Sequence, residues 1–242
     1  MTAIELFRAG RLSEAIQVLS DHVRQNPLDT RERTFLFELL CFAGEFDRGE
    51  KQLEMLAHGG QQAELGALLY RAALSAERDR QRFFSEKAYL EQAALPPAKP
   101  RAGTFNGKSF GEISDADPRI GARLEAFVAG QYLQVRFEHI ASLQMQAPKR
   151  LRDLLWAPVI VKNGPGFRGR DLGEVLVPVL SPFSWTHADE TVRLGRTTVW
   201  EEIEGAEVPF GQKMFLVDGE EIPWLELRTL EFTAAGEQSA AA

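Results

Sequence analysis

The chain has 242 residues, of which 44% are hydrophobic, and it carries a formal net charge of −7. Its length suits one large or two small domains, and its apolar content is sufficient for a packed core. Residues 1–94 hold 12 basic and 15 acidic side chains, and residues 95–242 hold 16 and 20. Neither part therefore has the basic excess that a nucleic-acid partner requires.

The N-terminal part contains an internal repeat. Ala9–Ala15 (AGRLSEA) returns as Ala43–Gly49 (AGEFDRG), a spacing of 34 residues. This is the period of the tetratricopeptide repeat (TPR), a helix–turn–helix unit that stacks on its neighbours and commonly binds other proteins. Gly10 and Gly44 fall where one helix must end and the next begin, a place that favours a residue without Cβ. We therefore predict TPR-like helices over residues 1–94.

The flanking sequence supports two such units and a weaker third. An apolar stripe at helical spacing precedes Pro27, which ends the first unit, and Asp29 is placed to cap the next helix. A third pair of helices is expected at about residues 62–77 and 82–93, where the helical period continues but the repeat signature fades. An ordinary helical bundle with a chance repeat is the alternative.

A proline-rich connector ends the helical pattern. Three prolines within Leu95–Pro100 cannot continue a helix and favour an extended chain. With the turn-rich sequence after them, they place a linker at residues 95–112. A β-rich α+β domain is expected at residues 113–233, and a disordered tail at 234–242. The predicted fold class is α+β with two domains, in which N-terminal TPR-like α-helical repeats precede the β-rich domain.

Beyond the linker, the apolar pattern takes the period of β-strands. Ala129-Gly130 and Asp218-Gly219 lie between apolar runs and predict hairpin turns, of which the second is the stronger signal. Short helical turns are expected at Asp117-Pro118 and at residues 137–140 and 149–156. The expected strands are Leu124–Val128, Tyr132–Phe137, Ser142–Gln146, Val159–Lys162, Glu174–Leu180, Thr197–Ile203, Lys213–Val217 and Ile222–Phe232.

The four tryptophans all lie in the second half of the chain. Trp156, Trp200 and Trp224 are predicted core residues, because each lies in or beside an apolar run. Trp185 lies in a loop rich in serine, proline and threonine, and we predict that it is exposed.

No pattern indicates an active site. Gly164–Gly169 (GPGFRG) matches G-x-G-x-x-G, but a β-type run comes directly after it and leaves no room for the helix that a dinucleotide site needs. The four histidines share no ligand spacing and Cys41 has no partner thiol, so we expect neither a metal nor a cofactor. Asp115 and Asp117 form a pair of carboxylates, for which a capping role beside Pro118 is sufficient.

The sequence predicts a cytoplasmic protein. No run approaches the ~18 apolar residues of a membrane span, and the N-terminus, with Glu5 and Arg8, has no apolar core of signal-peptide length. The single cysteine excludes an internal disulfide and fits a reducing compartment. Because Leu40 and Phe42 flank Cys41, we predict a buried thiol rather than a nucleophile.

The concave face of the repeats is the best-defined candidate binding site. The second, fifth, ninth and twelfth positions of each unit face this groove in the repeat register. They are charged at one end and apolar at the other, which suits an amphipathic helix and does not suit a basic clamp for a carboxylate. Alternatively, they are only the exposed face of a short stack. The candidate partner-binding residues are Glu5, Arg8, Arg31, Thr34, Glu38, Leu65, Leu68 and Ala72, with Cys41 and Ser75 at further groove positions.

Several motifs outside the repeat are more specific than the repeat itself. They are Asp115–Gly121 (DADPRIG), Arg152–Pro158 (RDLLWAP), Leu194–Trp200 (LGRTTVW), Gly211–Met214 (GQKM) and Glu221–Pro223 (EIP). With these motifs and the repeat, residues 1–232 resemble the ImpE/TagJ (SciE-type) accessory proteins of bacterial type VI secretion systems.

This resemblance implies a non-enzymatic cytoplasmic adaptor associated with the contractile sheath. Members of the family are thought to bind the N-terminal helix of the small sheath subunit (TssB/VipA type) and to connect it to the ClpV-type AAA+ ATPase. The resemblance carries over no catalytic residue. Two other interpretations stay open, a TPR-type adaptor or chaperone of another cytoplasmic assembly and an enzyme with its site in the β-rich half.

Overall fold

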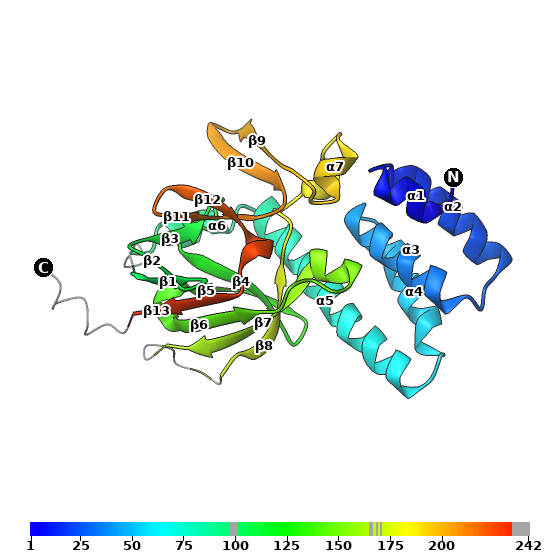
Figure 1. Cartoon of the computed structure of the whole chain (residues 1–242), viewed down its shortest axis with the longest axis horizontal. Helices are drawn as coiled ribbons and strands as arrows, with labels where there is room; N and C mark the ends of the chain where they lie inside the picture. The colour runs from blue at the N-terminus through cyan, green and yellow to red at the C-terminus, as the bar shows by residue number, and fades with distance from the viewer. Residues whose placement is uncertain (97–100, 165–166, 168, 170, 234–242) are drawn as a thin grey trace, which may run out of the picture.

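The computed structural model describes residues 1–96, 101–164, 167, 169 and 171–233. Helices form the N-terminal part and strands form most of the second part of the chain (Figure 1), which confirms the predicted α+β class. The expected tail at 234–242 lies outside the described residues, as do residues 97–100 of the expected linker. Within the described ranges, no helix is both long and apolar enough to cross a membrane.

The first two helix pairs form as the repeat period predicts. Gly10 and Gly44 lie at the turns inside these pairs with φ of +79° and +71°, the region that favours glycine. Asp29 caps the third helix by accepting a hydrogen bond from the backbone N–H of Glu32 at 3.0 Å. The helices before the strands are α1 (Ala3–Arg8), α2 (Leu12–Gln25), α3 (Thr30–Phe42), α4 (Phe46–Ala57), α5 (Gln61–Ser85) and α6 (Tyr89–Ala93).

The expected third helix pair is wrong. A single helix of 25 residues, α5, covers the first expected helix, the expected turn and the start of the second, and the five-residue α6 is the rest of the second. Residues 78–81, at the expected turn, are Arg, Asp, Arg and Gln. None of them breaks a helix as glycine or proline does, so nothing stops α5 there.

Antiparallel sheets make up the second part of the chain. Among the described residues, an eight-stranded sheet has the order β2-β1-β13-β6-β7-β8-β4-β5, and smaller sheets have the orders β12-β11-β3 and β10-β9. The strands are β1 (Gly103–Phe105), β2 (Lys108–Phe110), β3 (Ile113–Asp115), β4 (Arg123–Val128), β5 (Gln131–Arg136), β6 (Ile140–Met145), β7 (Trp156–Asn163), β8 (Gly173–Pro178), β9 (Thr198–Ile203), β10 (Ala206–Gly211), β11 (Met214–Val217), β12 (Glu220–Pro223) and β13 (Thr229–Phe232).

Short helical segments connect several of the strands. The segment before β7 is the one that the sequence predicts within residues 149–156, and the one before β6 lies within residues 137–140. They are η1 (Phe137–His139), η2 (Leu151–Leu154), η3 (Ser184–Thr186), α7 (Glu190–Arg193) and η4 (Trp224–Glu226).

Both turn signals that the sequence analysis names form hairpins. Ala129-Gly130 and Asp218-Gly219 join β4 to β5 and β11 to β12, and all four residues have positive φ. The expected strand Ile222–Phe232 is instead broken into β12, η4 and β13, because the chain turns after Pro223. Strands β1 and β2 lie inside the expected linker range and meet at Asn106-Gly107, a hairpin signal that was not recognised in the sequence.

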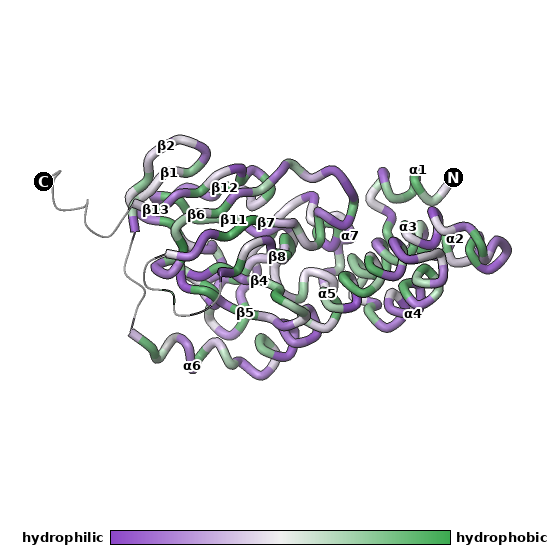
Figure 2. Tube along the Cα trace, turned by 90° about the horizontal axis from the view of Figure 1, so that it is seen from below, coloured by the Kyte–Doolittle hydropathy of each residue, from purple (hydrophilic) through white to green (hydrophobic). Residues whose placement is uncertain are grey.

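The helical and strand-rich parts share a core. The core of the helices includes Phe127, Leu155, Trp156 and Leu194, which all come from the second part of the chain. Figure 2 shows α5 between α1–α4 at one end and the strands at the other, and α5 contacts both α4 and β5. The boundaries of two separate domains stay a prediction.

Two of the tryptophan predictions are confirmed and two are wrong. Trp156 and Trp224 are buried in the two main cores. Trp200 is only partly buried, because the β9–β10 hairpin projects from the main sheet. Trp185 is not exposed but partly buried, because its ring lies against Gly44 and Phe46 of the helical part.

Candidate functional site

A closed network of charged side chains lies where α5 meets the sheet. Arg80 of α5 forms two hydrogen bonds to Glu125 of β4, at 2.8 and 2.9 Å, and Lys213 bonds to the same carboxylate. Lys213 also pairs with Asp115 at 2.7 Å. Tyr132 donates its hydroxyl to Glu125 at 2.7 Å. This network joins α5 to β3, β4 and β5 and to the residue that precedes β11.

Burial and charge pull the pKa values of the two carboxyls apart. Burial opposes ionisation of Glu125, but Arg80 and Lys213 outweigh it and hold its pKa at about 2. At Asp115, burial prevails over the single cation Lys213 and raises the pKa to about 6. Perturbed carboxyls of this kind can mark an active site. Here Asp115, Glu125 and Lys213 are at most 3% exposed, so no solute reaches them.

The capping interpretation of the aspartate pair is therefore incomplete. Asp117 does act locally, because it accepts a hydrogen bond from the backbone N–H of Arg119 at 2.9 Å and also binds that guanidinium. Asp115 accepts from the backbone N–H of Asp117 at 2.9 Å, but it is also the buried partner of Lys213. No sequence pattern indicates this pairing, because 98 positions separate the two residues.

The segment around η2 covers part of the predicted groove. Arg152 of η2 pairs with Glu38 of α3 at 3.0 Å and lies over the ring of Tyr70, 4.9 Å from its centroid. Trp156 stacks on Tyr70 and donates its indole N–H to Glu77 at 3.3 Å. The inner face of α3 and α5 is therefore closed at this point by the chain itself.

The turns of the repeats are also covered by the second part of the chain. A Cβ on Gly44 would overlap the indole of Trp185, and a Cβ on Gly10 would lie 3.1 Å from Thr191. Arg196 donates to the carbonyl of Arg8 at 2.9 Å, where the last carbonyls of α1 lack helical partners. Residues 185–196 thus hold both repeat turns, and the glycines allow the close approach.

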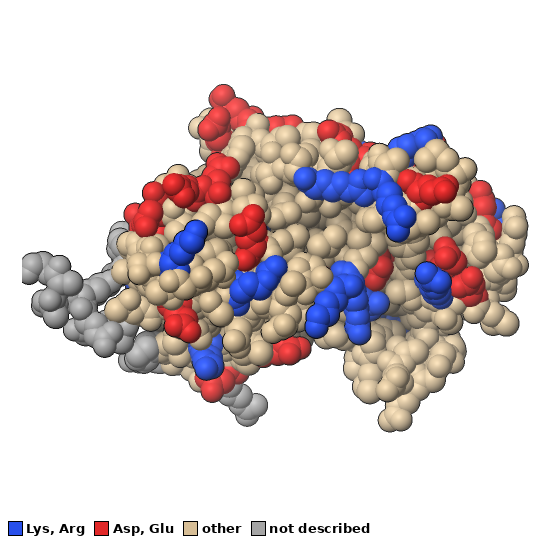
Figure 3. Space-filling model, in the orientation of Figure 1, with Lys and Arg blue, Asp and Glu red and all other residues tan. Residues whose placement is uncertain are grey.

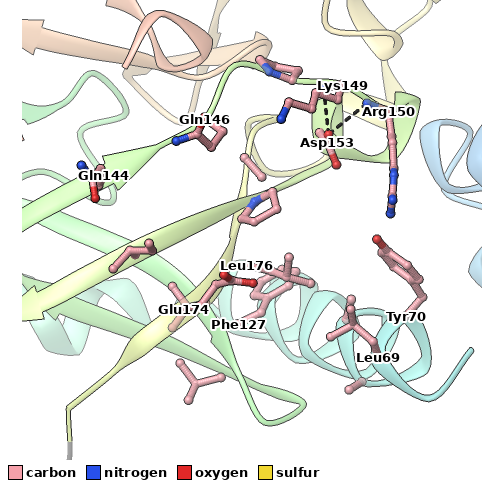
Figure 4. A pocket seen from close by; sticks show the side chains of 18 of the residues that line it. Leu69, Tyr70, Phe127, Gln144, Gln146, Lys149, Arg150, Asp153, Glu174 and Leu176 are labelled. Atoms are coloured by element: carbon pink, nitrogen blue, oxygen red, sulfur yellow. Dashed lines mark hydrogen bonds between the residues drawn. The ribbon is translucent and has the colours of Figure 1, made fainter. Parts of the chain in front are cut away.

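An open cleft lies beside α5 on the other side of η2. Its volume is about 500 Å³, within the range of ligand sites. We call it the α5 cleft (Figure 4). One wall is α5, another is the segment 144–150 with Asp153, and the rest comes from the β4–β5 turn and from β7 and β8. Its lining includes Leu69, Tyr70, Ala72, Ala73, Phe127, Gln144, Gln146, Lys149, Arg150, Asp153, Ile160, Glu174 and Leu176.

Charged groups lie at separate places around the α5 cleft. Lys149 and Arg150 are exposed, and within the described ranges neither side chain forms an ion pair. Asp153 is engaged by their backbone N–H groups, both at 2.9 Å. Figure 4 shows Lys149 and Arg150 on the wall across from α5, and Glu174 on the strand wall. Both signs of charge are therefore available to a partner.

An exposed apolar face of α5 continues from the cleft. Leu65, Leu68 and Leu69 are 60%, 62% and 50% exposed and lie at i, i+3 and i+4, on one side of the helix. Leu69 also lines the cleft. In Figure 3, the tip where α4 turns into α5, at the lower right, shows no charged side chain on the face in view, and basic side chains gather beside it. Glu64 lies in the first turn of α5, next to Leu65. We call these three leucines the α5 face.

The structure separates the predicted groove residues. Leu65, Leu68 and Ala72 lie together on α5 at the α5 face and the cleft. Glu38 is 6% exposed and paired with Arg152, so it does not line an open groove. The remaining predicted residues lie away from this site, on α1 and α3: Glu5, Arg8 and Arg31 are exposed, and Thr34 is partly buried.

Other sequence candidates have structural explanations. Cys41 is buried as predicted, and burial raises the pKa of its thiol well above the usual value. The loop Gly164–Gly169 falls partly outside the described residues, and none of the described residues between β7 and the start of β8 at Gly173 is helical. In the described part of the chain, no group of three or more His, Cys, Asp or Glu side chains could hold a metal ion.

Comparison with known proteins agrees with this architecture. The family model described as "ImpE protein" matches residues 107–231, just over half of the chain. The Type VI secretion system accessory component TagJ of Pseudomonas aeruginosa is 29% identical, and the alignment covers 96% of this chain and 91% of TagJ. A crystal structure of a protein from Vibrio parahaemolyticus has a TM-score of 0.83 at 22% identity, covering 96% of this chain and 97% of the other.

Proposed function

The chain belongs to the ImpE family, and on that premise we propose that it is a non-enzymatic accessory adaptor of a type VI secretion system. In this proposal it binds the N-terminal helix of the small sheath subunit (TssB/VipA type) and links that subunit to the ClpV-type AAA+ ATPase. The similarity to an accessory component over nearly its whole length supports the coarser part of this assignment. A cytoplasmic location belongs to the same proposal.

The observation that carries the helix-binding role is the α5 face. Three leucines at helical spacing are exposed beside a cleft of about 500 Å³. An amphipathic helix places its own apolar side chains at the same spacing, so it can cover such a face and extend into the cleft. The non-enzymatic part of the proposal is supported by the closed network, because solutes do not reach its carboxyls.

Calorimetry of the full chain with a peptide of the cognate subunit's N-terminal helix tests the helix-binding role. We expect saturable binding, and we expect a ternary complex with the ATPase when the assembled sheath pair is added. If neither the peptide nor the sheath pair binds, the type VI adaptor role is wrong and an adaptor of another assembly becomes the better hypothesis. Binding of the sheath pair without the ATPase would remove the linking role alone.

A further inference from the structure

A pocket formed by α2, α3 and α4 is lined by three arginines, one from each helix. Its volume is about 380 Å³, and it shares no lining residue with the α5 cleft. None of the described residues that line it is acidic, although the chain as a whole has a net charge of −7. We call it the arginine pocket, and define it by Arg24, Arg33 and Arg48 with the apolar side chains of Val23, Leu36 and Met55.

Arg33 is buried in the arginine pocket without a negatively charged partner. The residue is only 7% exposed. Its guanidinium donates to the amide oxygen of Gln52 at 2.8 Å and to the carbonyl of Pro27 at 2.7 Å, and it forms no ion pair within the described ranges. These two bonds fasten the α2–α3 turn to α4, but both acceptors are neutral. Because a buried charge is costly unless a counter-charge compensates it, this guanidinium favours an anion.

The other two arginines are available to the same anion. Arg48 pairs with Glu45 at 2.5 Å and Arg24 pairs with Asp21 at 3.0 Å, and all four side chains are at least 39% exposed. Such exposed ion pairs contribute little to stability, so a ligand can share or replace them at little cost. Together with these two carboxylates, the three guanidiniums leave one net positive charge. That balance suits a single carboxylate better than a phosphate dianion, and the guanidinium fork matches its two oxygens.

Apolar side chains adjoin the cations and indicate where the carboxylate comes from. Val23 and Leu36 are buried, whereas Met55 is 53% exposed, so the pocket is open to water. A ligand site for a small molecule encloses most of the ligand's surface, which this open pocket does not do. A peptide segment brings its own surface, and a carboxylate and an apolar side chain on neighbouring residues fit the guanidiniums and Met55.

We propose that the arginine pocket binds an acidic segment of a protein partner. One carboxylate of the segment pairs with Arg33 and Arg48, and an adjacent apolar side chain lies against Met55. This inference goes beyond the proposed function, since the pocket and the α5 face have no residue in common. The chain then carries two separate binding surfaces.

Fluorescence anisotropy of the full chain with a labelled peptide in which glutamate alternates with leucine tests the site. The matched peptide has glutamine in place of each glutamate. We expect wild type to bind the glutamate peptide about tenfold more tightly, and we expect Arg33→Gln and Arg48→Gln to lose that preference. The control is Lys51→Gln, which removes an exposed cation of α4 outside the pocket and should retain the preference.

Four results would overturn the inference. One is equal binding of the two peptides by wild type. Another is binding that Leu68→Asp abolishes and Arg48→Gln does not, which would place the peptide at the α5 face. Displacement of the peptide by inorganic phosphate at constant ionic strength would assign a phosphate ligand instead. Self-association of wild type that is lost in Arg48→Gln would identify a second copy of the chain as the occupant.

The sheath peptide separates this inference from the proposed function. It should bind Arg48→Gln as tightly as it binds wild type, so the arginine pocket can fail while the adaptor role stands, and the reverse also holds. Circular dichroism checks the fold of each variant. If Arg33→Gln does not fold, Arg48→Gln still decides the outcome, because the Arg48 side chain is 49% exposed and its removal leaves the core intact.

Discussion

Glu38 of α3 and Leu68 of α5 are both groove positions in the repeat register, yet their environments in the folded chain are opposite. Glu38 is buried beneath η2 and paired with Arg152, whereas Leu68 is exposed beside an open cleft. The difference arises from what the second part of the chain covers, and not from the repeat itself. A repeat register therefore predicts which side of a helix faces the groove, but not whether that groove is still open.

Among the variants considered, the loss of stability should be largest when Glu125, at the centre of the buried charged network, is replaced. Replacing it in Glu125→Gln leaves Arg80 and Lys213 buried without a full counter-charge, and we expect a loss of about 3–5 kcal/mol in the free energy of unfolding. Urea denaturation followed by tryptophan fluorescence measures this loss. Glu174→Gln, an exposed carboxylate in the cleft, should change stability by less than about 0.5 kcal/mol. Equal losses in the two variants would contradict the fastening role of the network.

The second-largest loss of stability is expected from a change at the contact between Gly44 and Trp185. Gly44→Ala adds a Cβ that overlaps the indole, whereas Gly107→Ala adds one at a similar positive φ with no atom within 4 Å. We expect Gly44→Ala to cost about 1–3 kcal/mol more than Gly107→Ala, because only the first displaces a packed ring. When Trp185→Ala is added to each of these two variants, most of the difference should disappear. Thermal unfolding of the two single and the two double variants measures it. A difference that persists without the indole would assign the cost to the backbone.

A substitution at Glu38 should affect the stability of the fold but not the binding of the sheath peptide. In Glu38→Gln, Arg152 loses its carboxylate while both side chains remain in place, and we expect a loss of about 1 kcal/mol or less, because the burial that raises the pKa of Glu38 offsets its attraction to Arg152. The affinity for the sheath peptide should not change, because η2 already covers this position. A loss of affinity without a loss of stability would mean that the groove at α3 opens to admit a partner, and would remove the distinction between the two sides.

The pH dependence of stability should show the carboxyls of Asp115 and Glu125 with opposite signs. The pKa of Asp115 is about 6, above its usual value, so the folded state binds the proton more tightly and stability falls as the pH rises towards and through 6. The pKa of Glu125 is about 2, below its usual value, so its stabilising contribution is lost as the pH falls from about 4.5 towards 2. We expect the free energy of unfolding to be about 1 kcal/mol higher at pH 5 than at pH 7.

Urea titrations at a series of pH values measure this profile. Asp115→Asn should flatten its upper limb, between pH 5 and 7, because it removes the group that titrates there. The acid limb should persist in that variant, since it depends on Glu125. A profile of Asp115→Asn that still falls between pH 5 and 7 would assign that limb to another group.

Sequence patterns correctly predicted those elements whose conformation depends on residues close together in the chain. The glycine turns of the repeat and the hairpins at Ala129-Gly130 and Asp218-Gly219 depend on neighbouring residues alone. The length of α5 was missed because a helical period without a breaker does not show where one helix ends. The pairing of Lys213 with Asp115 depends on strands that meet only in the folded sheet, so no sequence spacing indicates it.

Contacts between residues that are distant in the sequence also limited how much of the candidate site could be predicted. Leu65, Leu68 and Ala72 could be placed from the repeat register, because they are positions on one helix. Lys149 and Arg150 were not recognised, because they reach α5 only when β7 and η2 pack against the helices. The repeat register thus predicted Ala72 in the α5 wall of the cleft and two leucines of the α5 face beside it, whereas the charged wall follows only from the fold.

The smallest effect on stability is expected on the open side. Leu68 is 62% exposed, so Leu68→Asp removes little buried area and should change the free energy of unfolding by less than about 0.5 kcal/mol. Affinity for the sheath peptide should fall sharply in the same variant, whereas Leu28→Asp, at a leucine that is 92% exposed, should change neither quantity. A large loss of stability in Leu68→Asp would show that this leucine is covered in solution by the chain itself. The contrast between the closed and open sides would then fail at the residue on which it depends most.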